Sequence, residues 1–377
     1  MRSLQSLMNV YEDARLSRQN VYAVYIDYSN AFNTINQDKL LHVLYDLGFP
    51  NVAIDAVKGI YYEAVTRIKT CAGKTEAIPV DRGVLQGDTL SPFLFNCFTE
   101  PLTRWLHVGG RGYSMGCMSG TSKTLQMKCR TASSGYADDT TLVTNTVRNM
   151  VLQMNKVEQY SGWGNLKLNV SKCAATGMPR QDIEKHAMPS PLTQLGCERL
   201  KQQLAAIKID GQPVPFAHPE KAPQKILGVL VTPTLDWKPQ IDRLLEEAKI
   251  RAGKIVESDA TPRQKLTWIQ TCLKPYLTYS FPLTYLAKQD IYRLDAVLAQ
   301  AAKRALRLPL ATPTGLVLQQ QRLFGAGIES LLIDYAQLST AHLTRALNDT
   351  GKLGTITKNL MKMQHSHLGL HLSLIHI

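Results

Sequence analysis

Two adjacent carboxylates, Asp138 and Asp139, follow Tyr136 and Ala137 where the flanking residues predict a β-hairpin. Adjacent Asp side chains repel each other unless a cation shares them, so a divalent metal is the natural ligand of such a pair. A solvated turn is the commoner setting for two neighbouring Asp residues. The pair therefore needs supporting groups elsewhere in the chain before it indicates a metal site.

A third carboxylate, Asp27, closes residues 21–26, which form an unbroken run of β-forming side chains. Such a run predicts a strand buried on both faces. A charge at the end of a buried strand is costly unless the side chain reaches a cleft or a cation. Asp27 is thus a further candidate for metal chemistry, and only folding can bring it to Asp138, which lies far along the chain.

A glycine-containing loop lies between these carboxylates, at residues 81–93. Gly83 and Gly87 would let the backbone approach a ligand closely. Ser91 and Pro92 suit the N-cap and the first position of a helix that continues with an apolar face. Glycine turns before helices are common in proteins of every kind, so the loop indicates either ligand binding or a simple turn.

The helices and strands that position these residues can be predicted from the spacing of apolar side chains along the sequence. Apolar side chains at helical spacing predict helices over 4–14, 40–47, 54–61, 93–105 and 147–157, with Asp38 capping the second. β-Forming runs predict strands over 67–70, 76–80, 125–130, 140–143, 166–170 and 225–231, and residues 109–122 read as a surface loop. A two-residue turn signal at Asp210-Gly211 links residues 207–209 to Val214. After Pro233 helices dominate, at 241–254, 263–273 and 290–308.

The composition indicates a globular protein with a basic surface. The chain has 377 residues, 44% of them hydrophobic, which is enough for two or three packed units. Lys and Arg number 43 against 30 Asp and Glu, a net charge of +13 that fits either a polyanionic partner or a soluble basic surface. Lys303, Arg304 and Arg307 are predicted on one face of the last helix, as phosphate contacts or as a solvated face.

Several classes of protein are disfavoured. The seven Cys residues are scattered without a CxxC pair, which argues against a disulfide framework and a zinc knuckle. No stretch approaches the ~18 uninterrupted apolar residues that cross a bilayer. His365, His367 and His371 lack a carboxylate or Cys partner, so we do not expect a metal site there. These features predict a soluble, intracellular protein without membrane contact, and they predict nothing about its oligomeric state.

Taken together, the motifs resemble those of one polymerase family. Asp27 with Phe32, the stretch 83–92 and the stretch 136–139 stand in the order and at the spacing found in the palm of reverse transcriptases of non-LTR (LINE-like) retrotransposons. Lys172 and Leu227-Gly228 stand where the later palm motifs of that family fall. The resemblance is strong over residues 1–232 and loose beyond, and several motifs in the right order are far more specific than any one of them.

The resemblance implies an α+β fold, with an antiparallel palm sheet backed by helices and then a helical thumb-like region. Residues 1–20 would be a helix from the junction of fingers and palm, residues 21–232 the palm, and residues 233–377 the thumb-like part, with the family's fingers preceding residue 1. The implied activity is template-dependent addition of deoxynucleotides by two-metal phosphoryl transfer, with Mg²⁺ or Mn²⁺ as cofactor.

The resemblance also implies roles for particular residues. Asp27, Asp138 and Asp139 would hold the metal ions, and Lys172 would neutralise or protonate departing pyrophosphate. Tyr28, Phe32, Gln86 and Gly87 would contact the incoming nucleotide, with Phe32 placed under the sugar so that a 2′-hydroxyl is rejected. The implied primer and template contacts are Leu227, Gly228, Lys303, Arg304 and Arg307, and the implied partners are an RNA template, a DNA primer and dNTPs.

Alternative interpretations remain open at this point. The chain could be an inactive fragment of a retroelement that binds nucleic acid through its positive charge and catalyses nothing. A group II intron-type reverse transcriptase shares the same carboxylate motif. An RNA-dependent RNA polymerase fits less well, because Phe32 would exclude ribonucleotides and Tyr136-Ala137 replaces the glycine typical of that class. For a eukaryotic element, the resemblance implies a nuclear or cytoplasmic ribonucleoprotein.

Overall fold

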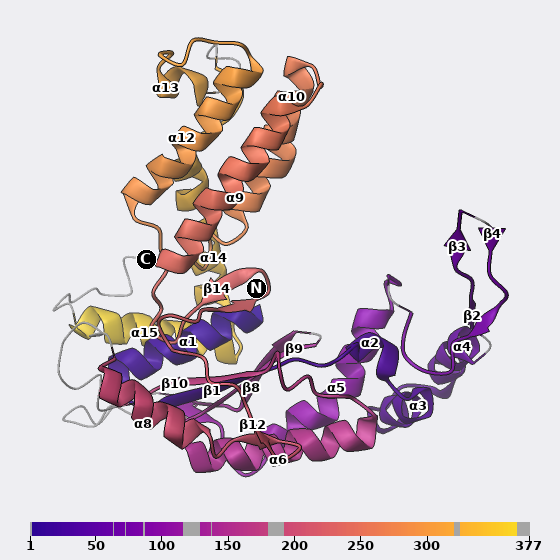
Figure 1. Cartoon of the computed structure of the whole chain (residues 1–377). Coiled ribbons are helices and arrows are strands. Elements are labelled where there is room, and N and C mark those ends of the chain that lie inside the picture. Colours follow the sequence, from indigo (N-terminus) through magenta and orange to yellow (C-terminus); the bar gives the residue numbers. More distant parts are fainter. Residues whose placement is uncertain are drawn as a thin grey trace. The chain divides into compact units, whose positions relative to one another are not determined.

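The chain folds into two compact units. This computed structural model describes residues 2–62, 64–71, 73–85, 87–115, 129–136, 138–179, 192–319 and 325–367 (Figure 1). Contacts within the chain divide it into Met1–Ala222 and Pro223–Ile377. The sequence placed this boundary after residue 232. It lies earlier because the hairpin formed by residues 224–231 is bonded to helices of the second unit, as described below.

A four-stranded antiparallel sheet forms the centre of the first unit. Its strand order is β10 (Ala174–Met178), β1 (Val21–Ile26), β9 (Asp139–Thr144) and β8 (Ser133–Tyr136). All six residues of β1 are buried, because this strand is flanked by β10 and β9 and covered on both faces. The prediction of a fully buried strand before Asp27 is therefore confirmed.

One strand of the sheet was not predicted. Residues 166–170 were expected to be a strand, but there only Leu168 makes a single bridge, to Tyr28. The strand that pairs with β1 is β10, whose sequence of small residues and Gly177 lacks bulky β-formers. A Cβ on Gly177 would lie 2.8 Å from the Val21 carbonyl oxygen, so close packing rather than β-propensity selects this residue.

Helices cover the two faces of this sheet. α5 (Ser91–His107) and α6 (Val147–Gly164) lie on one side and α1 (Arg2–Ser17) lies on the other (Figure 1). The core on the α5–α6 side includes Val24, Ile26 and Leu142 of the sheet together with Phe95 and Phe98. On the other side, the hydroxyls of Tyr11 and Tyr25 are hydrogen-bonded at 2.6 Å, and desolvation by burial is the main reason that both pKa values are raised.

Shorter elements complete the first unit. They are α2 (Ala31–Thr34), α3 (Gln37–Asp46), α4 (Asn51–Tyr61), β2 (Val65–Thr66), β3 (Lys69–Thr70), β4 (Gly73–Lys74), β5 (Ile78–Pro79), β6 (Tyr113–Met115), β7 (Cys129–Thr131), α8 (Gln194–Leu204), β11 (Lys208–Ile209) and β12 (Gln212–Pro213).

Three local predictions in this unit were wrong. Asn36, not Asp38, caps α3 by accepting a hydrogen bond from the Lys39 amide, which leaves Asp38 in the first turn. Ser91 is the first residue of α5 rather than its N-cap, and its hydroxyl donates to the Leu85 carbonyl at 2.6 Å. Part of the expected surface loop 109–122 is the strand β6, in which Tyr113 is fully buried. Residues 116–128 lie outside the described residues.

The second unit is a hairpin followed by helices. The hairpin consists of β13 (Gln224–Ile226) and β14 (Val229–Val231). The helices are α9 (Lys238–Glu257), α10 (Pro262–Trp268), a π-helical turn (Ile269–Leu273), α11 (Lys274–Thr278), α12 (Lys288–Ala305), α13 (Thr314–Val317), α14 (Leu331–Asn348) and α15 (Lys352–His367).

The three helical regions predicted after residue 233 are confirmed, since α9, α10 with the π-helical turn, and α12 occupy them. The core of the second unit lies between α9 and α12, where Leu244, Ala248, Leu294 and Leu298 are buried together. Among the described residues, no helix has the length and apolar character needed to span a bilayer.

Candidate active site

The strand register brings Asp27 and Asp139 to the same edge of the sheet. Within the pair formed by β1 and β9, Ile26 is the partner of Thr140. Continuing this register by one residue places Asp27 opposite Asp139, at the end of the central strand. Tyr136 pairs with Asp139 across the β8–β9 hairpin, so Asp138 lies in the turn between these two strands. The hairpin predicted from the sequence is therefore present, with Asp138 at its tip.

Asp27 and Asp139 also share one face of the sheet. Side chains alternate between faces along a strand, and Ile26 and Leu142 both belong to the core on the α5–α6 side. Asp27 is one residue from Ile26, and Asp139 is three residues from Leu142. Each is therefore an odd number of residues from a core position, and both carboxylates lie on the other face of the sheet. Asp27 is half-buried, and Asp138 and Asp139 are exposed.

The alternation of side chains between the two faces of the sheet also rules out one predicted nucleotide contact, that of Tyr28. Tyr28 is 6% exposed and belongs to the core under the sheet, and its burial raises its pKa to about 12. Its side chain therefore faces away from the carboxylates. The proposed contact between the Tyr28 side chain and a nucleotide is corrected, because a residue next to Asp27 in a strand must point to the opposite face.

Backbone contacts fix the position of Asp27. The Asp27 carbonyl accepts a hydrogen bond from the Asn169 amide at 2.9 Å, and the Asp27 amide donates to Cys173 Sγ at 3.4 Å. Burial is the main reason that the pKa of the Cys173 thiol is raised, so the sulfur stays neutral. The exposed Lys172 lies in the same turn, where its amide donates to the Asn169 carbonyl at 3.0 Å. Lys172 is thus tied to the segment that holds Asp27.

The glycine loop is bonded to the segment that follows Asp27. The Gly83 amide donates to the Ile35 carbonyl at 2.7 Å, and the Val84 amide donates to the Phe32 carbonyl at 2.8 Å. Gly83 has a φ of +83°, and a Cβ at this position would lie 2.6 Å from Asn33 Cα. The sequence analysis expected Gly83 to let the backbone approach a ligand. The structure shows that it allows the close approach of the two segments.

Phe32 lies on α2, which follows β1, and its ring stacks on Phe95 of α5 with 4.8 Å between the ring centroids. Phe32 is half-buried, so it is packed against Phe95 and still partly accessible. Gly87 has a φ of +96° and open space around its Cα. Gln86, the other nucleotide contact expected in the loop, lies outside the described residues.

The Leu227-Gly228 pair forms the tight turn between β13 and β14. Leu227 has a φ of +47° and Gly228 a φ of +82°, as expected for a two-residue hairpin turn with a right-handed strand twist. Tyr279 donates its hydroxyl to the Leu227 carbonyl at 2.9 Å, and Arg243 donates to the Gly228 carbonyl at 3.0 Å. Both carbonyls of the turn are therefore held by side chains that sequence analysis did not select.

Replacing Tyr279 with phenylalanine is expected to loosen this turn without unfolding the unit. The change removes one partly exposed hydrogen bond, worth about 0.5–1.5 kcal/mol. Amide hydrogen exchange of residues 224–231 should therefore become roughly two- to tenfold faster. Tyr285→Phe, the same chemical change at an exposed Tyr with no hydrogen bond in the described structure, is the control. Equal exchange rates in the two variants would show that the Tyr279 hydroxyl does not hold the turn.

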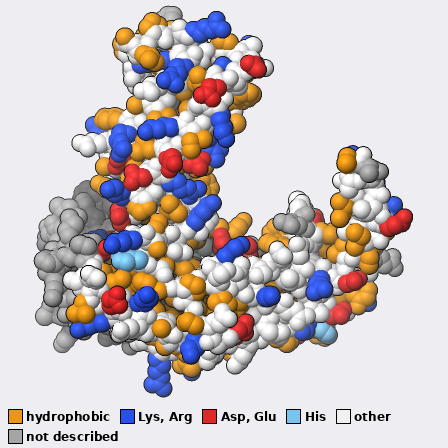
Figure 2. Space-filling model, in the orientation of Figure 1, with side chains coloured by type: hydrophobic (Ala, Val, Ile, Leu, Met, Phe, Trp, Pro, Cys, Tyr) orange, Lys and Arg blue, Asp and Glu red, His pale blue; other side chains and the backbone are white. Residues whose placement is uncertain are grey.

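The three cations predicted on one face of α12 do not share a solvent-facing surface. Lys303 is 5% exposed, and its ammonium donates to the Leu310 carbonyl at 3.0 Å. Arg304 is exposed near the end of α12, and Arg307 lies beyond it with a φ of +57°. Lys303 is therefore corrected to a structural residue that holds the following loop. On the visible face of the helical unit, Lys and Arg side chains are interspersed with Asp and Glu (Figure 2).

The described residues contain no group of three or more His, Cys, Asp and Glu side chains placed to hold a metal ion. The two positions that the register brings together, 27 and 139, carry hard carboxylate oxygens. Mg²⁺ is commonly bound by one or two carboxylates, with waters and substrate phosphates as the other ligands. The residues present therefore fit Mg²⁺ by donor type and by strand register.

A known protein family matches more than half of this chain. The sequence model of the family described as reverse transcriptase (RNA-dependent DNA polymerase) matches residues 1–229. The chain belongs to this family. Its α+β fold, with an antiparallel sheet backed by helices and a following helical unit, is the fold that the motifs implied.

The relatives are Pol polyproteins of R2 retrotransposable elements. The chain is 25% identical over 321 residues to that of the type-2 element R2DM of Drosophila melanogaster, and 22% identical over 312 residues to that of a type-1 element R2 of Nasonia vitripennis. These alignments cover 83% and 82% of this chain but only 27% of each relative. Apo telomerase from Candida Tropicalis is a similar solved structure, with 11% identity, a TM-score of 0.42 and coverage of 96% of this chain and 57% of that one.

Proposed function

We propose that this chain is the palm and thumb-like part of an RNA-directed DNA polymerase of a non-LTR retrotransposon. The observation that supports this most strongly is the register between β1 and β9, in which Ile26 pairs with Thr140, so that the next residues, Asp27 and Asp139, lie at the same edge of the sheet as the turn that carries Asp138. Carboxylates that are far apart in the sequence but lie together at one edge of the sheet fit two-metal phosphoryl transfer better than they fit a structural role.

Within this proposal, Asp27, Asp138 and Asp139 hold Mg²⁺, for which Mn²⁺ can substitute. The bound metal supplies charge stabilisation at the transferred phosphoryl group. Asn169 and Cys173 hold the backbone of Asp27, which fixes the direction of its carboxylate. Lys172 lies in the same turn, where its ammonium can neutralise pyrophosphate. Gly87 lines the nucleotide site. Leu227-Gly228, with Arg304 and Arg307, contacts the primer and template.

The proposed partners are an RNA template, a DNA primer and dNTPs, in a nuclear or cytoplasmic ribonucleoprotein if the element is eukaryotic. A helical unit that carries twelve Lys and Arg against seven Asp and Glu between residues 241 and 310 suits contact with phosphates. Such contacts position a duplex without reading its sequence.

Primer extension tests the proposal. The full chain is incubated with a DNA primer annealed to an RNA template and with dNTPs, and the product length is measured with Mg²⁺ and with EDTA. We expect extension with Mg²⁺, and a loss of at least about 10³-fold when EDTA removes the metal, because metal stabilisation of the transition state is worth several kcal/mol. Binding of the primer–template without extension would instead support the alternative, an inactive fragment that binds nucleic acid through its charge.

Phe32→Val is expected to relax the choice of sugar. Phe32 is stacked on Phe95, so its ring can exclude a 2′-hydroxyl without being displaced. Valine leaves room for that hydroxyl, and we expect the ratio of dNTP to rNTP incorporation to fall by about tenfold or more, which corresponds to at least 1.4 kcal/mol. Competition between dCTP and CTP in primer extension measures the ratio. An unchanged ratio in a variant that still incorporates dCTP would contradict the proposed gate.

A further inference from the structure

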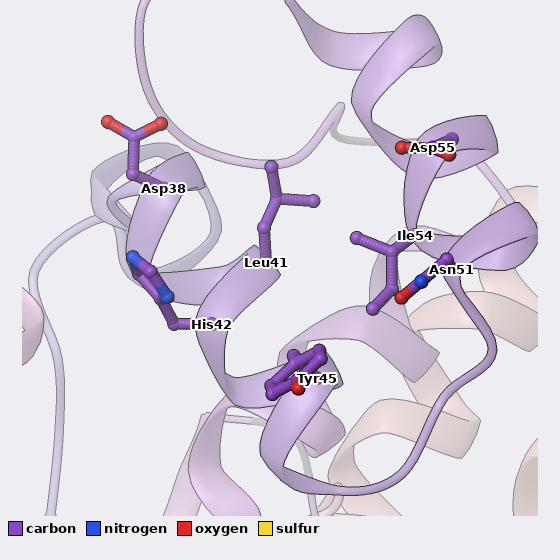
Figure 3. Close-up of a pocket in the computed structure, with 7 residues that line it drawn as sticks. All are labelled: Asp38, Leu41, His42, Tyr45, Asn51, Ile54 and Asp55. Atoms are coloured by element: carbon purple, nitrogen blue, oxygen red, sulfur yellow. The ribbon is translucent and has the colours of Figure 1, made fainter.

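An open groove lies between α3 and α4, two helices joined by a short loop. It encloses about 600 Å³ and is lined by Asp38, Leu41, His42 and Tyr45 of α3 and by Asn51, Ile54 and Asp55 of α4. Figure 3 shows Leu41 and Ile54 between the two helices, with Asp38 and Asp55 on opposite walls. We call this surface the α3–α4 groove.

The residues along the groove leave apolar surface uncovered. α4 is amphipathic, with Asn51, Asp55 and Lys58 on one side and Ile54, Val57 and Tyr61 packed on the core. Ile54, which lines the groove from this helix, is half-buried. On the other wall, Tyr45 is 66% exposed. Single exposed apolar residues need no explanation, whereas several next to a groove mark an interaction surface.

The charges at the groove indicate which partner suits it. Asp38 and Asp55 stand on its two walls, in a chain whose net charge is +13. The Tyr62 hydroxyl donates to Asp38 at 2.9 Å, which holds this carboxylate in place. Lys58, the nearby cation on α4, lies over the Tyr62 ring, 5.1 Å from its centroid. Two carboxylates repel phosphates, so the groove suits a cationic partner and disfavours nucleic acid.

We propose that the α3–α4 groove binds a basic amphipathic helix of a partner protein. An α-helix with its side chains is about 10–12 Å across and packs by ridges into the furrow between two other helices. Leu-like side chains of the partner contact Leu41, Tyr45 and Ile54, and Lys or Arg side chains at its edges pair with Asp38 and Asp55. This interaction is separate from the proposed polymerase function and does not depend on it.

Peptide binding to the full chain tests the proposal. The probes are two fluorescent synthetic helices of about 18 residues, one built from Leu and Lys and one from Leu and Glu at the same helical spacing. Fluorescence anisotropy should detect binding of the Leu–Lys helix and none of the Leu–Glu helix. The double change Asp38→Asn with Asp55→Asn, and separately Tyr45→Ala, should each weaken binding by about tenfold or more. Asp46→Asn, an exposed residue of α3 outside the groove lining, is the matched control and should leave affinity unchanged.

Several outcomes would overturn the proposal. Binding of the Leu–Glu helix, or affinity for the Leu–Lys helix that the Asp38, Asp55 and Tyr45 variants leave unchanged, would show that the groove does not select a basic helix. A dimer in sedimentation that Asp55→Lys dissociates would assign the surface to a second copy of this chain. Cross-linking of RNA to Tyr45 would assign it to nucleic acid.

Discussion

Asp27→Asn is expected to lower the rate of primer extension by at least about 10³-fold while leaving the fold intact. The amide keeps the shape of the side chain but removes a charge that would hold Mg²⁺, and metal stabilisation of the transition state is worth several kcal/mol. Single-turnover incorporation of one dNTP at saturating primer–template measures this step. Asp138→Asn, at the tip of the hairpin, should have an effect of the same order.

A second measurement separates loss of metal from loss of folding. The register places Asp27 opposite Asp139, and like charges directly opposite each other on neighbouring strands are destabilising. Without metal, Asp27→Asn should therefore be as stable as the parent chain or more stable. Mg²⁺ should raise the melting temperature of the parent chain, because a ligand that binds the folded state stabilises it, and should not raise that of the variant.

The control for this prediction is Asp46→Asn, which removes a carboxylate exposed at the end of α3. It should change neither the rate of extension nor the response to Mg²⁺. A Mg²⁺-dependent rise in melting temperature that persists in Asp27→Asn would show that the metal binds elsewhere. The assignment of Asp27 as a ligand would then be wrong.

Gly83→Ala is expected to destabilise the first unit strongly. The new Cβ would lie 2.6 Å from Asn33 Cα and 2.8 Å from the Asn33 carbonyl carbon and oxygen, all backbone atoms that cannot rotate away. Overpacking costs about 1–3 kcal/mol, and the left-handed φ adds roughly 1–2 kcal/mol for an L-residue. We expect a loss of about 2–5 kcal/mol in the free energy of unfolding, measured by urea denaturation.

Two other glycines separate the causes of this loss. Gly87 also has a positive φ but has open space around it, so Gly87→Ala should show the conformational cost alone, roughly 1–2 kcal/mol. Gly59 lies in α4 with open space around it and without a positive φ, so Gly59→Ala should be neutral or stabilising by up to about 1 kcal/mol. Equal losses for Gly83→Ala and Gly87→Ala would mean that the contact with Asn33 is not tight.

Gly83→Ala should also slow primer extension. The amides of Gly83 and Val84 are bonded to the segment that carries Phe32, so moving the loop moves this ring as well. We expect the dNTP KM to rise more than the maximal rate falls, because the change displaces nucleotide contacts and leaves the carboxylates in place. Titration of dNTP in primer extension measures both quantities.

The sequence alone determined the elements with strong local signals. Six consecutive β-formers defined β1, and apolar periodicity defined α1, α6 and the main helices of the second unit, because each of these patterns dictates burial along the element itself. The order of Asp27, the glycine loop and the Tyr136–Asp139 stretch also determined the family, since several ordered motifs are rarely met by chance.

Only the tertiary structure decided which of these residues lie together. β10 has weak β-propensity and becomes a strand because Gly177 lets it pack against Val21. Whether Lys303 faces solvent depends on where α12 ends and on how the following loop folds back onto the helix. The apolar periodicity of the sequence encodes neither of these features. The supports of the site, Cys173 at Asp27 and Tyr279 at Leu227, are far from their partners in sequence, and long-range contacts leave no local pattern for a sequence to show.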